Sequence, residues 1–507
     1  MPSKDVGVSG KSIIIIGAGI AGLSTGCYCQ MNGYRTRVFE MHTLPGGVCT
    51  AWKRSGYTID GCIHWLTGSS PANTFYRIWE ELGVVQGRSF VDHDEYARIV
   101  GTGDDVFIVY SDVDRLEQHM KELAPEDTDV IEEFTHGIRT SARFPIPWEK
   151  APELWGPADG LRLAFKMSPL LGFMRKWGKT TISEFAQRFR NPFLREAFPL
   201  APNLQHPADY PMLALLTTLA WKGGYPVGGS LELARAVEQR YRDLGGEISY
   251  GSRVVEILVE DDRAVGVRLA DGSEHRADIV ISAADGHSTI FDMLSGRYVG
   301  DKIRGYYDKL PLFPPLVYVG LGVARSFDRF QATTTGVSYP LDEPISIDKR
   351  SRRRMDVQMY DFDPNMAPVG KTLVRVMYAS DYEYWDDLHQ DPEAYKAEKE
   401  RIADQVVAAL DRRFPGLADA VEMRNVATPM TWVRYTGNWR GSFEGWLISA
   451  KTLRMRMSKT LPGLDGFYMA GQWVAPGGSV PYVAVSSRHV TQLICKKDRK
   501  RFVTTTP

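Results

Sequence analysis

The segment SIIIIGAGIAGLSTGCYCQMNGYRTRVFE, residues 12–40, carries the pattern from which the fold of this chain is best predicted. Its β-branched start, residues 12–16, is typical of a buried parallel strand. Three glycines then open a helix that extends to about residue 32 and ends at Gly33. A second strand follows and ends in Glu40. This order of strand, GxGxxG turn, helix, strand and acid predicts a dinucleotide-binding unit.

Each glycine of the turn has a physical reason. Gly17 permits the tight turn, Gly19 lets a pyrophosphate approach the backbone, and Gly22 lets the helix pack closely on the strand. The helix begins with Ile20 and Ala21. The pyrophosphate is therefore expected at the unpaired N–H groups and the positive dipole of this helix end.

The acid that closes the unit discriminates between nucleotides. Glu40 is expected to accept hydrogen bonds from the ribose of an adenosine. Because its negative charge repels a 2′-phosphate, the residue argues against NADP at this site.

A second glycine turn follows at once, in VFEMHTLPGGVCTAW, residues 38–52, where Gly46 and Gly47 are adjacent. An NAD unit needs no such extension, whereas an FAD site must also hold a ribityl chain and a flavin ring. Far along the chain, residues 466–471 predict another strand, and a turn at 477–481 leads into a helix from about 482 to 495. The N–H groups of this second turn and helix can point toward a flavin.

These motifs resemble those of one known family. Residues 17–61 are similar to the N-terminal FAD motif of the phytoene desaturase family, which includes carotenoid desaturases, carotenoid cis-trans isomerases and retinol saturases. Residues 471–486 resemble the C-terminal FAD motif of that family. The segments 225–257, 277–289 and 428–446 are similar to family segments in the same order. The resemblance is therefore spread over almost the whole chain.

The resemblance implies a non-covalently bound FAD. The backbone of Val254 is expected to pair with the adenine edge. Val48 stands where the family often has an arginine, so a cation near the phosphates would come from elsewhere, with Lys53 and Arg54 as alternatives. Ser486-Ser487 stands where the family often has Ser-Gly. The expected cofactor contacts are Gly17, Gly19, Ile20, Ala21, Gly22, Glu40, Gly46, Gly47, Val48, Val254, Gly471, Gly478 and Val480.

At 507 residues the chain is long enough for two domains, and the two distant FAD motifs predict that these are interleaved. The expected fold class is α/β, with a Rossmann-like FAD-binding domain of the glutathione-reductase type and an α+β substrate domain. The FAD-binding domain is predicted to comprise residues 11–70, 225–290 and 455–495. The substrate domain is predicted to comprise residues 71–224 and 291–454, and residues 496–507 form a basic tail.

A second dinucleotide turn is not predicted. Gly320-Leu321-Gly322 follows an apolar strand, but residues 326–331 form a poor helix and no acid closes a following strand. No dedicated NAD(P)H domain is therefore expected. An external nicotinamide donor would use the substrate channel or another protein.

One segment combines large apolar residues with basic ones. In LRLAFKMSPLLGFMRKWGK, residues 161–179, Pro169 is expected to break a helix in two. An amphipathic stretch of this kind can lie in a bilayer interface and admit a lipid-soluble substrate. The alternative is a helix that packs on the core. Residues 161–179 are thus a candidate peripheral membrane contact, since the substrates of the similar family are hydrophobic.

Four residues are candidates for substrate contact or catalysis. His64 follows the FAD extension and could move a proton near physiological pH, although a hydrogen-bonded core histidine is the alternative. Trp65, Tyr435 and Trp446 are candidates for aromatic walls of the substrate pocket. No further catalytic residue is predicted, because a flavin accepts or donates the hydride in this chemistry.

The composition excludes several other classes of protein. The 61 basic and 62 acidic residues balance, which gives no overall attraction to nucleic acid. Five cysteines show neither paired nor metal-ligand spacing, so no metal is expected and a reducing, cytoplasmic location is favoured. The first ten residues lack a signal-peptide pattern, and no stretch is apolar and long enough to span a membrane.

These observations together predict an FAD-dependent oxidoreductase that acts on carbon–carbon bonds of a long hydrophobic substrate, such as a carotenoid, a retinoid or another lipid. Desaturation, saturation and flavin-assisted cis-trans isomerisation all remain open. The alternatives are a flavin amine oxidase and a non-catalytic lipid-binding protein of related fold.

Overall fold

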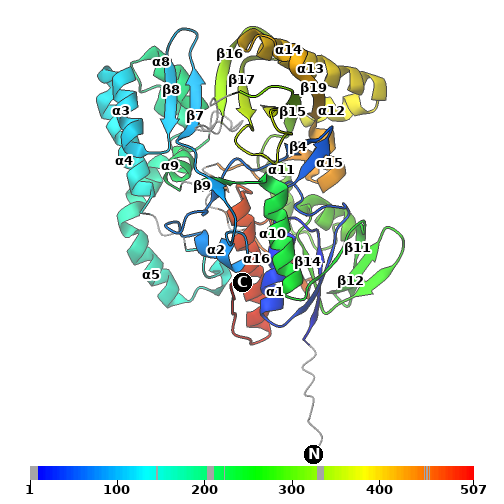
Figure 1. The fold of residues 1–507 in the computed structure, drawn as a ribbon. Coiled ribbons are helices and arrows are strands. Elements are labelled where there is room, and N and C mark those ends of the chain that lie inside the picture. Colours follow the sequence, from blue (N-terminus) through cyan, green and yellow to red (C-terminus); the bar gives the residue numbers. More distant parts are fainter. Residues whose placement is uncertain are drawn as a thin grey trace, which may run out of the picture.

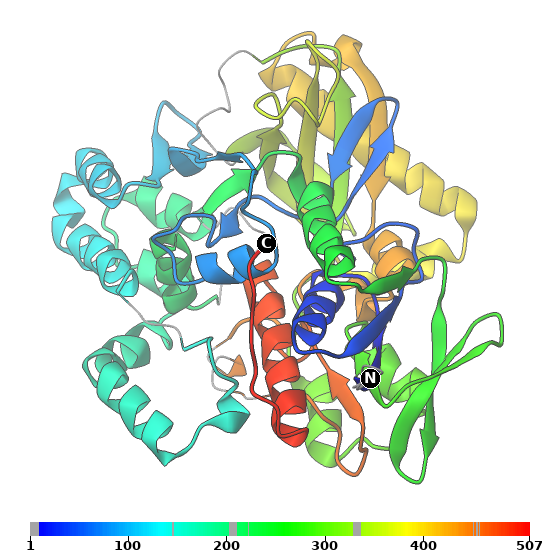
Figure 2. The same cartoon turned by 60° about the horizontal axis from the view of Figure 1, so that its bottom comes forward.

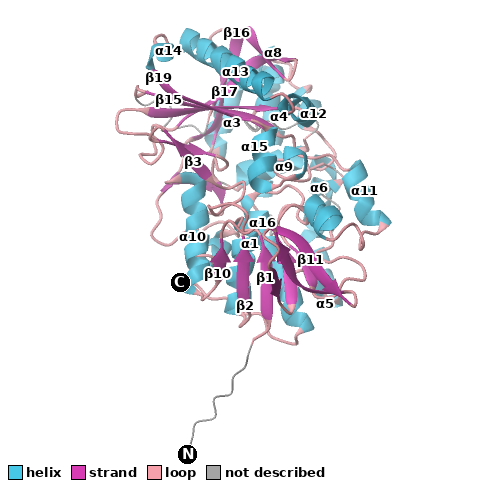
Figure 3. Cartoon of the chain, turned by 90° about the vertical axis from the view of Figure 1, so that its right-hand side faces the viewer, coloured by secondary structure: helices cyan, strands magenta, loops and turns pink. Residues whose placement is uncertain are grey.

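The computed structural model describes residues 10–143, 147–201, 210–221, 223–327, 336–449, 451–452, 455 and 457–507. Two large sheets lie at opposite ends of the molecule (Figure 1), a five-stranded parallel sheet below and a seven-stranded mixed sheet above. Figure 3 shows the same two layers from the side, with helices between them.

The parallel sheet is assembled from three distant parts of the chain. Its order is β10-β2-β1-β14-β20. The strands are β1 (Ser12–Ile16), β2 (Arg35–Phe39), β10 (Glu247–Ser249), β14 (Ile279–Ser282) and β20 (Phe467–Met469). The last of these strands, β20, pairs with β14, and Val280 lies opposite Phe467 in this pair. The fold is therefore α/β with one domain interleaved through the other, as the two distant motifs predicted.

Both faces of the parallel sheet are buried, which explains the β-branched sequence of β1. Ile13 and Ile15 pack in one core with helices α1 (Ile20–Met31), α10 (Gly229–Asp243) and α16 (Val480–Lys497). Ile14 and Ile16 pack in another core with a three-stranded antiparallel sheet. That sheet consists of β11 (Val254–Glu260), β12 (Arg263–Leu269) and β13 (Glu274–Arg276).

The mixed sheet has the order β19-β15-β18-β17-β16-β7-β8. Its strands are β7 (Glu95–Val100), β8 (Val106–Tyr110), β15 (Leu316–Val323), β16 (Val337–Ile347), β17 (Arg350–Met359), β18 (Thr372–Ala379) and β19 (Val421–Ala427). Gly320 and Gly322 lie inside β15, which pairs with a strand on each side. These glycines form a strand and no nucleotide turn, as predicted. Helix α13 (Pro392–Arg413) packs against this sheet.

Further short helices and strands lie along the chain. They are β3 (Ala51–Arg54), β4 (Tyr57–Asp60), β5 (Leu66–Thr67), α2 (Tyr76–Glu81), β6 (Phe90–Val91), β9 (Gly223–Pro226), α11 (Asp301–Lys309), α12 (Tyr382–His389), α14 (Leu417–Ala420) and α15 (Pro429–Thr436). Helix α2 packs in the same core as α1 and α16.

A group of helices forms a separate core rich in phenylalanine. These helices are α3 (Val113–Leu123), α4 (Thr128–Ser141), α7 (Ile182–Ala186), α8 (Pro192–Ala197) and α9 (Met212–Ala220). The segment 161–179 lies at the edge of this group (Figure 2). Its helices α5 (Pro157–Met167) and α6 (Leu171–Trp177) are separated by a short turn that contains Pro169. The predicted break is therefore present.

The two halves of this segment differ in burial. Helix α5 has no buried residue, and Leu161 and Phe165 are 75% and 81% exposed. In α6, Trp177 is buried and Phe173 packs against the phenylalanine-rich core. Of the two alternatives predicted for this segment, packing on the core therefore holds for α6 and not for α5. No helix in the described part of the chain is long and apolar enough to cross a bilayer.

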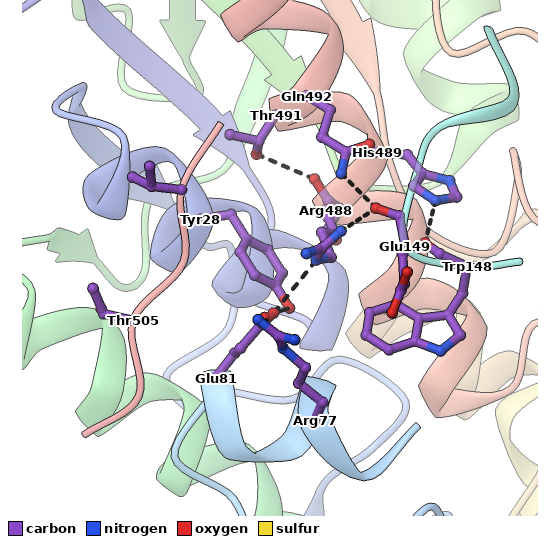
Figure 4. Close-up of polar contacts among 12 residues, drawn as sticks. Tyr28, Arg77, Glu81, Trp148, Glu149, Arg488, His489, Thr491, Gln492 and Thr505 are labelled. Carbon is purple, nitrogen blue, oxygen red and sulfur yellow. Dashed lines mark hydrogen bonds and ion pairs between the residues drawn. The ribbon is translucent and has the colours of Figure 1, made fainter. Parts of the chain in front are cut away.

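A buried polar network ties helix α16 to three other segments (Figure 4). Glu81 accepts a hydrogen bond of 2.9 Å from the hydroxyl of Tyr28 and pairs with Arg488 of α16. The ring of His489 hydrogen-bonds the Trp148 carbonyl at 2.7 Å. Gln492 donates to the Glu149 carbonyl at 2.7 Å. Because a buried ion needs its partner, this network holds α16 against α1, α2 and the loop before α5.

The C-terminal residues lie against the molecule beside α16 (Figure 2). Phe502 packs on the ring of Tyr28, with centroids 6.1 Å apart. The backbone N–H of Val503 donates to Asn32 at 2.9 Å, and the carbonyl of Thr505 accepts from Arg240. The segment predicted as a basic tail therefore completes α16 at Lys497 and then packs on the parallel-sheet domain.

Replacing Gly22 by alanine tests the contact between α1 and β1. An added Cβ would lie 1.8 Å from the carbonyl oxygen of Gly17, so the helix must move away from the turn. The control is Gly305→Ala in α11, where an added Cβ meets nothing within 4 Å. The control is expected to be neutral or to gain up to about 1 kcal/mol of stability, whereas Gly22→Ala is expected to lose roughly 2 kcal/mol or more. Equal midpoints of thermal unfolding for the two variants would contradict this contact.

Candidate functional site

A cavity of about 440 Å³ opens at the carboxyl ends of the parallel strands. Ile16, Phe39, Ala283 and Gly471, which end or follow β1, β2, β14 and β20, all line it. The carboxyl edge of a parallel sheet is where α/β proteins bind nucleotides. Of the residues predicted to contact a cofactor, the cavity is lined by Gly17, Gly19, Ile20, Ala21, Glu40, Gly46, Gly47, Val48, Val254, Gly471, Gly478 and Val480.

The two N-terminal glycine turns touch each other. The N–H of Gly46 donates to the carbonyl of Ala18 at 2.9 Å, and Gly19 forms a parallel bridge with Gly46. Gly46 has a φ of 110°, and an added Cβ would lie 2.1 Å from the carbonyl oxygen of Cys49. Gly22 does not line the cavity and instead lets α1 approach Gly17.

Glu40 joins the first turn to the loop after β2. Its carboxylate accepts hydrogen bonds from the N–H of Ala18 at 2.6 Å and of His42 at 2.7 Å. Burial raises the pKa of Glu40, and these N–H donors act in the opposite direction. Each oxygen of the carboxylate can accept more than one hydrogen bond, so Glu40 can still bind ribose hydroxyls.

The C-terminal motif meets the N-terminal one through two serines. The N–H of Gly471 donates to the hydroxyl of Ser486 at 2.8 Å. The hydroxyl of Ser487 donates to the carbonyl of Ala21 at 2.7 Å. Ser487, the residue that departs from the family pattern, thus binds α16 directly to α1.

Neither cation that was predicted to lie near the phosphates lines the cavity, but a different arginine does. Lys53 and Arg54 are exposed on β3 and do not line the cavity, so neither occupies the place predicted for it. Arg253, next to Val254, lines the cavity instead. Sequence proximity suggested the wrong cations because the β3–β4 hairpin carries them to the surface.

The aromatic candidates lie in three different places. Tyr435 lines the cavity beside His42, with ring centroids 5.2 Å apart, at the end that holds Glu40. Trp446 is 1% exposed, donates to the Trp473 carbonyl at 3.2 Å and does not line the cavity. Trp65 lines a second cavity of about 340 Å³ and packs on Tyr96, with centroids 4.7 Å apart.

His64 lines neither of the two cavities. Its Nε2 is buried and has no hydrogen-bond partner among the described residues. Burial and the nearby charge of Arg375 hold the pKa of His64 well below its usual range. The ring is therefore neutral at physiological pH and cannot act there as a proton donor in its charged form.

Glu444 is a cavity residue that sequence reasoning missed. Burial raises its pKa to about 8, with no hydrogen bond or charge from the described residues to offset it. The charge of Glu444 also contributes to the raised pKa values of Cys62, Tyr96 and Tyr210, so these side chains are near it. A lone acid in the apolar stretch GSFEGW, residues 441–446, was the available signal.

The loop that carries Glu444 is held from both sides. The hydroxyl of Ser442 donates to the carbonyl of Phe313 at 3.0 Å, and the N–H of Gly477 donates to the carbonyl of Trp446 at 3.1 Å. A Cβ at Gly478 would lie 2.1 Å from the carbonyl oxygen of Glu444. The acid is therefore fixed beside the C-terminal glycine turn.

A second acid bridges the two domains. Asp285, after β14, accepts hydrogen bonds from the N–H of Ser288 at 2.7 Å and from the N–H of Trp439 at 2.8 Å. Burial raises the pKa of Asp285 to about 6. No cluster of three or more potential metal ligands occurs in the described part of the chain.

The interleaved parallel sheet, the paired glycine turns and the cavity at the strand ends define a dinucleotide-binding flavoprotein fold. The sequence pattern of one family, described as flavin containing amine oxidoreductase, matches residues 20–495. This chain belongs to that family. Membership implies an FAD cofactor and places the chain among flavin oxidoreductases.

Individual relatives agree with this placement. The chain is 24% identical to a chloroplastic prolycopene isomerase of Arabidopsis thaliana over 95% of its own length and 82% of the relative's. It is 25% identical to a 4,4′-diapophytoene desaturase of a Methylomonas species, over 97% and 96% of the two chains. The predicted resemblance to the carotenoid desaturase and isomerase family is thereby confirmed.

Solved structures show the same fold. An oxidoreductase from Methanosarcina mazei matches with a TM-score of 0.60 and 17% identity, over 95% of this chain and 100% of the other. A putrescine oxidase bound to putrescine matches with a TM-score of 0.57 and 14% identity, over 96% and 99%.

Replacing Glu444 by glutamine tests its burial. The pKa is about 8 in the folded protein and near 4.5 when unfolded. As pH rises from 4.5 to 8, the unfolded chain loses this proton first, so the wild type loses stability relative to Glu444→Gln. The difference in free energy of unfolding between the two proteins is expected to grow by up to about 1.4 kcal/mol per pH unit and to level off above pH 8.

Thermal midpoints of the two proteins, measured between pH 5 and 8.5, check this prediction. Glu126→Gln, at an exposed position, is the matched control. A difference between wild type and Glu444→Gln that stays constant across this range would contradict the burial of the carboxylate.

Proposed function

We propose that this protein is an FAD-dependent oxidoreductase that acts on carbon–carbon bonds of a long apolar substrate by desaturation, saturation or cis-trans isomerisation. The observation that carries the proposal is the aromatic and apolar wall around Glu444, the acid beside the C-terminal glycine turn. Phe443 and Glu444 line the cavity, and Tyr96 and Tyr210 lie near the acid. The relatives named for prolycopene and diapophytoene support the same class of substrate.

The residues of the cavity fit an extended FAD. Glu40 suits the adenosine ribose, and the N–H groups at the start of α1 suit the pyrophosphate. Arg253 can add a positive charge near these phosphates. The turn at Gly478 and the N-terminus of α16 would hold the flavin half. Because Glu40 is at one end and Glu444 beside the other turn, the two acids mark opposite halves of the site.

The substrate would approach through the second cavity. Trp65 and Tyr96 line that cavity together with Leu219, and Tyr96 is also near Glu444. Aromatic side chains bury large apolar areas and can stack on a flat conjugated chain. We therefore place the route of the substrate past Trp65 and Tyr96 toward the flavin half of the site.

Bound FAD supplies the two-electron acceptor or donor for this chemistry. The protein's own contribution is to orient the substrate, to exclude water with its aromatic wall and to donate or accept one proton. Glu444 is protonated near neutral pH because its pKa is about 8. Its carboxylic acid can donate a proton to a carbon atom during saturation, and its carboxylate can take one up during desaturation. Glu444 therefore replaces His64 as the candidate acid or base.

Amine oxidation is the second candidate. An ionised Glu444 with aromatic rings nearby could bind an ammonium group, since charge pairing and cation–π contact both favour a cation. A non-catalytic lipid-binding role is the third alternative, and family membership argues against it.

Anaerobic spectroscopy of the flavin tests the proposal. The purified protein is expected to be yellow, and bleaching by phytoene would indicate desaturation. Reoxidation of the reduced flavin by an unsaturated lipid would indicate saturation. Isomerisation of prolycopene that needs reduced flavin without net electron transfer would indicate an isomerase. In each case Glu444→Gln is expected to lower the rate by roughly two to four orders of magnitude while the flavin content stays unchanged.

Two results would overturn the proposal. One is a protein that is colourless and cannot be reconstituted with FAD. The other is a flavin that responds to amines alone. NADH and NADPH are added separately, since no nicotinamide domain is predicted.

We also propose that α5 contacts a membrane surface. Leu161 and Phe165 are exposed on α5, and Leu171 at the start of α6 is 59% exposed. Arg162 and Lys166 lie on the same helix as the first two. Exposed apolar side chains flanked by basic ones are suited to an anionic bilayer interface.

Binding to vesicles of phosphatidylcholine with phosphatidylglycerol tests this contact. The double variant Leu161→Asp, Phe165→Asp is expected to bind roughly tenfold more weakly or worse, because each side chain contributes about 1.5–3 kcal/mol when buried. The control is Val369→Asp, which changes an exposed apolar residue elsewhere. Equal binding of the double variant and the control would contradict the proposal.

A further inference from the structure

Two cysteines face each other on the wall of the cofactor cavity. Strands β3 and β4 pair in an antiparallel register that joins Ala51 with Asp60. The pairing continues by one residue, since the N–H of Gly61 donates to the carbonyl of Thr50 at 2.9 Å. Cys49 and Cys62 are the next residues beyond this pairing, where the chain bends on both sides, so they lie at the same end of the hairpin.

Three observations agree that the two thiols are adjacent. Both cysteines line the cavity. A hydrogen bond between the thiols of Cys62 and Cys49 is the largest of the causes that raise the pKa of Cys62, followed by burial. The paired residues next to them in the hairpin bring the two cysteines to the same end, and a disulfide needs Cα atoms about 4.4–6.8 Å apart.

The positions of both cysteines are set by a buried acid and a serine. Asp60 accepts hydrogen bonds from the N–H of Cys62 at 2.9 Å and from the N–H of Ser230 at 2.6 Å. The thiol of Cys49 donates to the carbonyl of Ser230 at 3.8 Å. Gly229 has no side chain here because a Cβ would lie 2.1 Å from the carboxylate of Asp60. The pair is thus held by the start of α10 as well as by its own hairpin.

We propose that Cys49 and Cys62 form a dithiol–disulfide redox centre that exchanges two electrons with the flavin and takes its electrons from an external dithiol. The proposal rests on the FAD site proposed above. The two thiols release two protons and two electrons and form one S–S bond, and the flavin is reduced by these electrons and protons. An external dithiol then reduces the disulfide and leaves as its own disulfide.

Two features of the cavity suit this exchange. Glu444 lines the same cavity and is near enough to raise the pKa of Cys62, and its ionised form, which predominates above its pKa of about 8, can receive a thiol proton. The exchange also supplies an electron source to a fold in which no nicotinamide domain is predicted. The other three cysteines do not line the cavity and are buried between helices or near the C-terminus.

Disulfide mapping of the protein tests the pair without any catalytic assay. Flavin-free protein treated with oxidised dithiothreitol and then alkylated is expected to yield a peptide pair that links Cys49 to Cys62 by mass spectrometry. Reduced protein given excess FAD without oxygen is expected to form the same link. Free thiols at both positions under both conditions would overturn the proposal.

The holoprotein provides the second test. Without oxygen, dithiothreitol is expected to bleach the flavin of the wild type roughly tenfold faster than that of Cys49→Ala or Cys62→Ala. The control is Cys27→Ala, at a buried cysteine outside the cavity. Equal bleaching rates in all four proteins, each with full flavin content, would overturn the proposal.

The outcome is separable from that of the proposed function. Loss of all polyene chemistry with an intact Cys49–Cys62 exchange would contradict the substrate and leave the redox centre standing. Normal polyene chemistry with unchanged rates in both cysteine variants would contradict the redox centre alone.

Discussion

The structure depends on how closely two glycine turns approach each other. A hydrogen bond from the N–H of Gly46 to the carbonyl of Ala18 joins the turn after β1 to the turn after β2. A side chain at Gly46 would collide with the backbone of Cys49, so the approach requires glycine there. From this contact the chain follows the cavity wall at Val48 and Cys49 before it enters the β3–β4 hairpin.

Much of the fold could be predicted because its determinants are local. The β-branched run of β1, its glycines and Glu40 follow one another in sequence and keep that order at the sheet edge. The hairpin of β11 and β12 is equally local, with its turn at Asp261 and Asp262, both of positive φ. The mixed sheet agrees with the rejection of a second nucleotide turn in β15.

The rest depended on contacts between distant residues. Arg253 reaches the cavity through the three-stranded sheet, whereas the nearer Lys53 and Arg54 end on the surface. The direction of the Trp446 side chain is set by its packing on Trp473. It could not be predicted from the sequence, because a loop has no periodicity from which a buried face can be read. Glu444 can be recognised as a cavity residue only when its loop is placed beside the C-terminal turn. Such residues are apparent once the sheet has been assembled.

The interleaved order of the parallel sheet has a consequence for how the protein is made. Strand β20 and helix α16 come from the last part of the chain, yet they complete the sheet that β1 begins. During synthesis the face of α1 that packs on α16 therefore stays uncovered until nearly the whole chain has left the ribosome. The cofactor site is consequently among the last parts of the molecule to form, and a truncated product would lack it altogether.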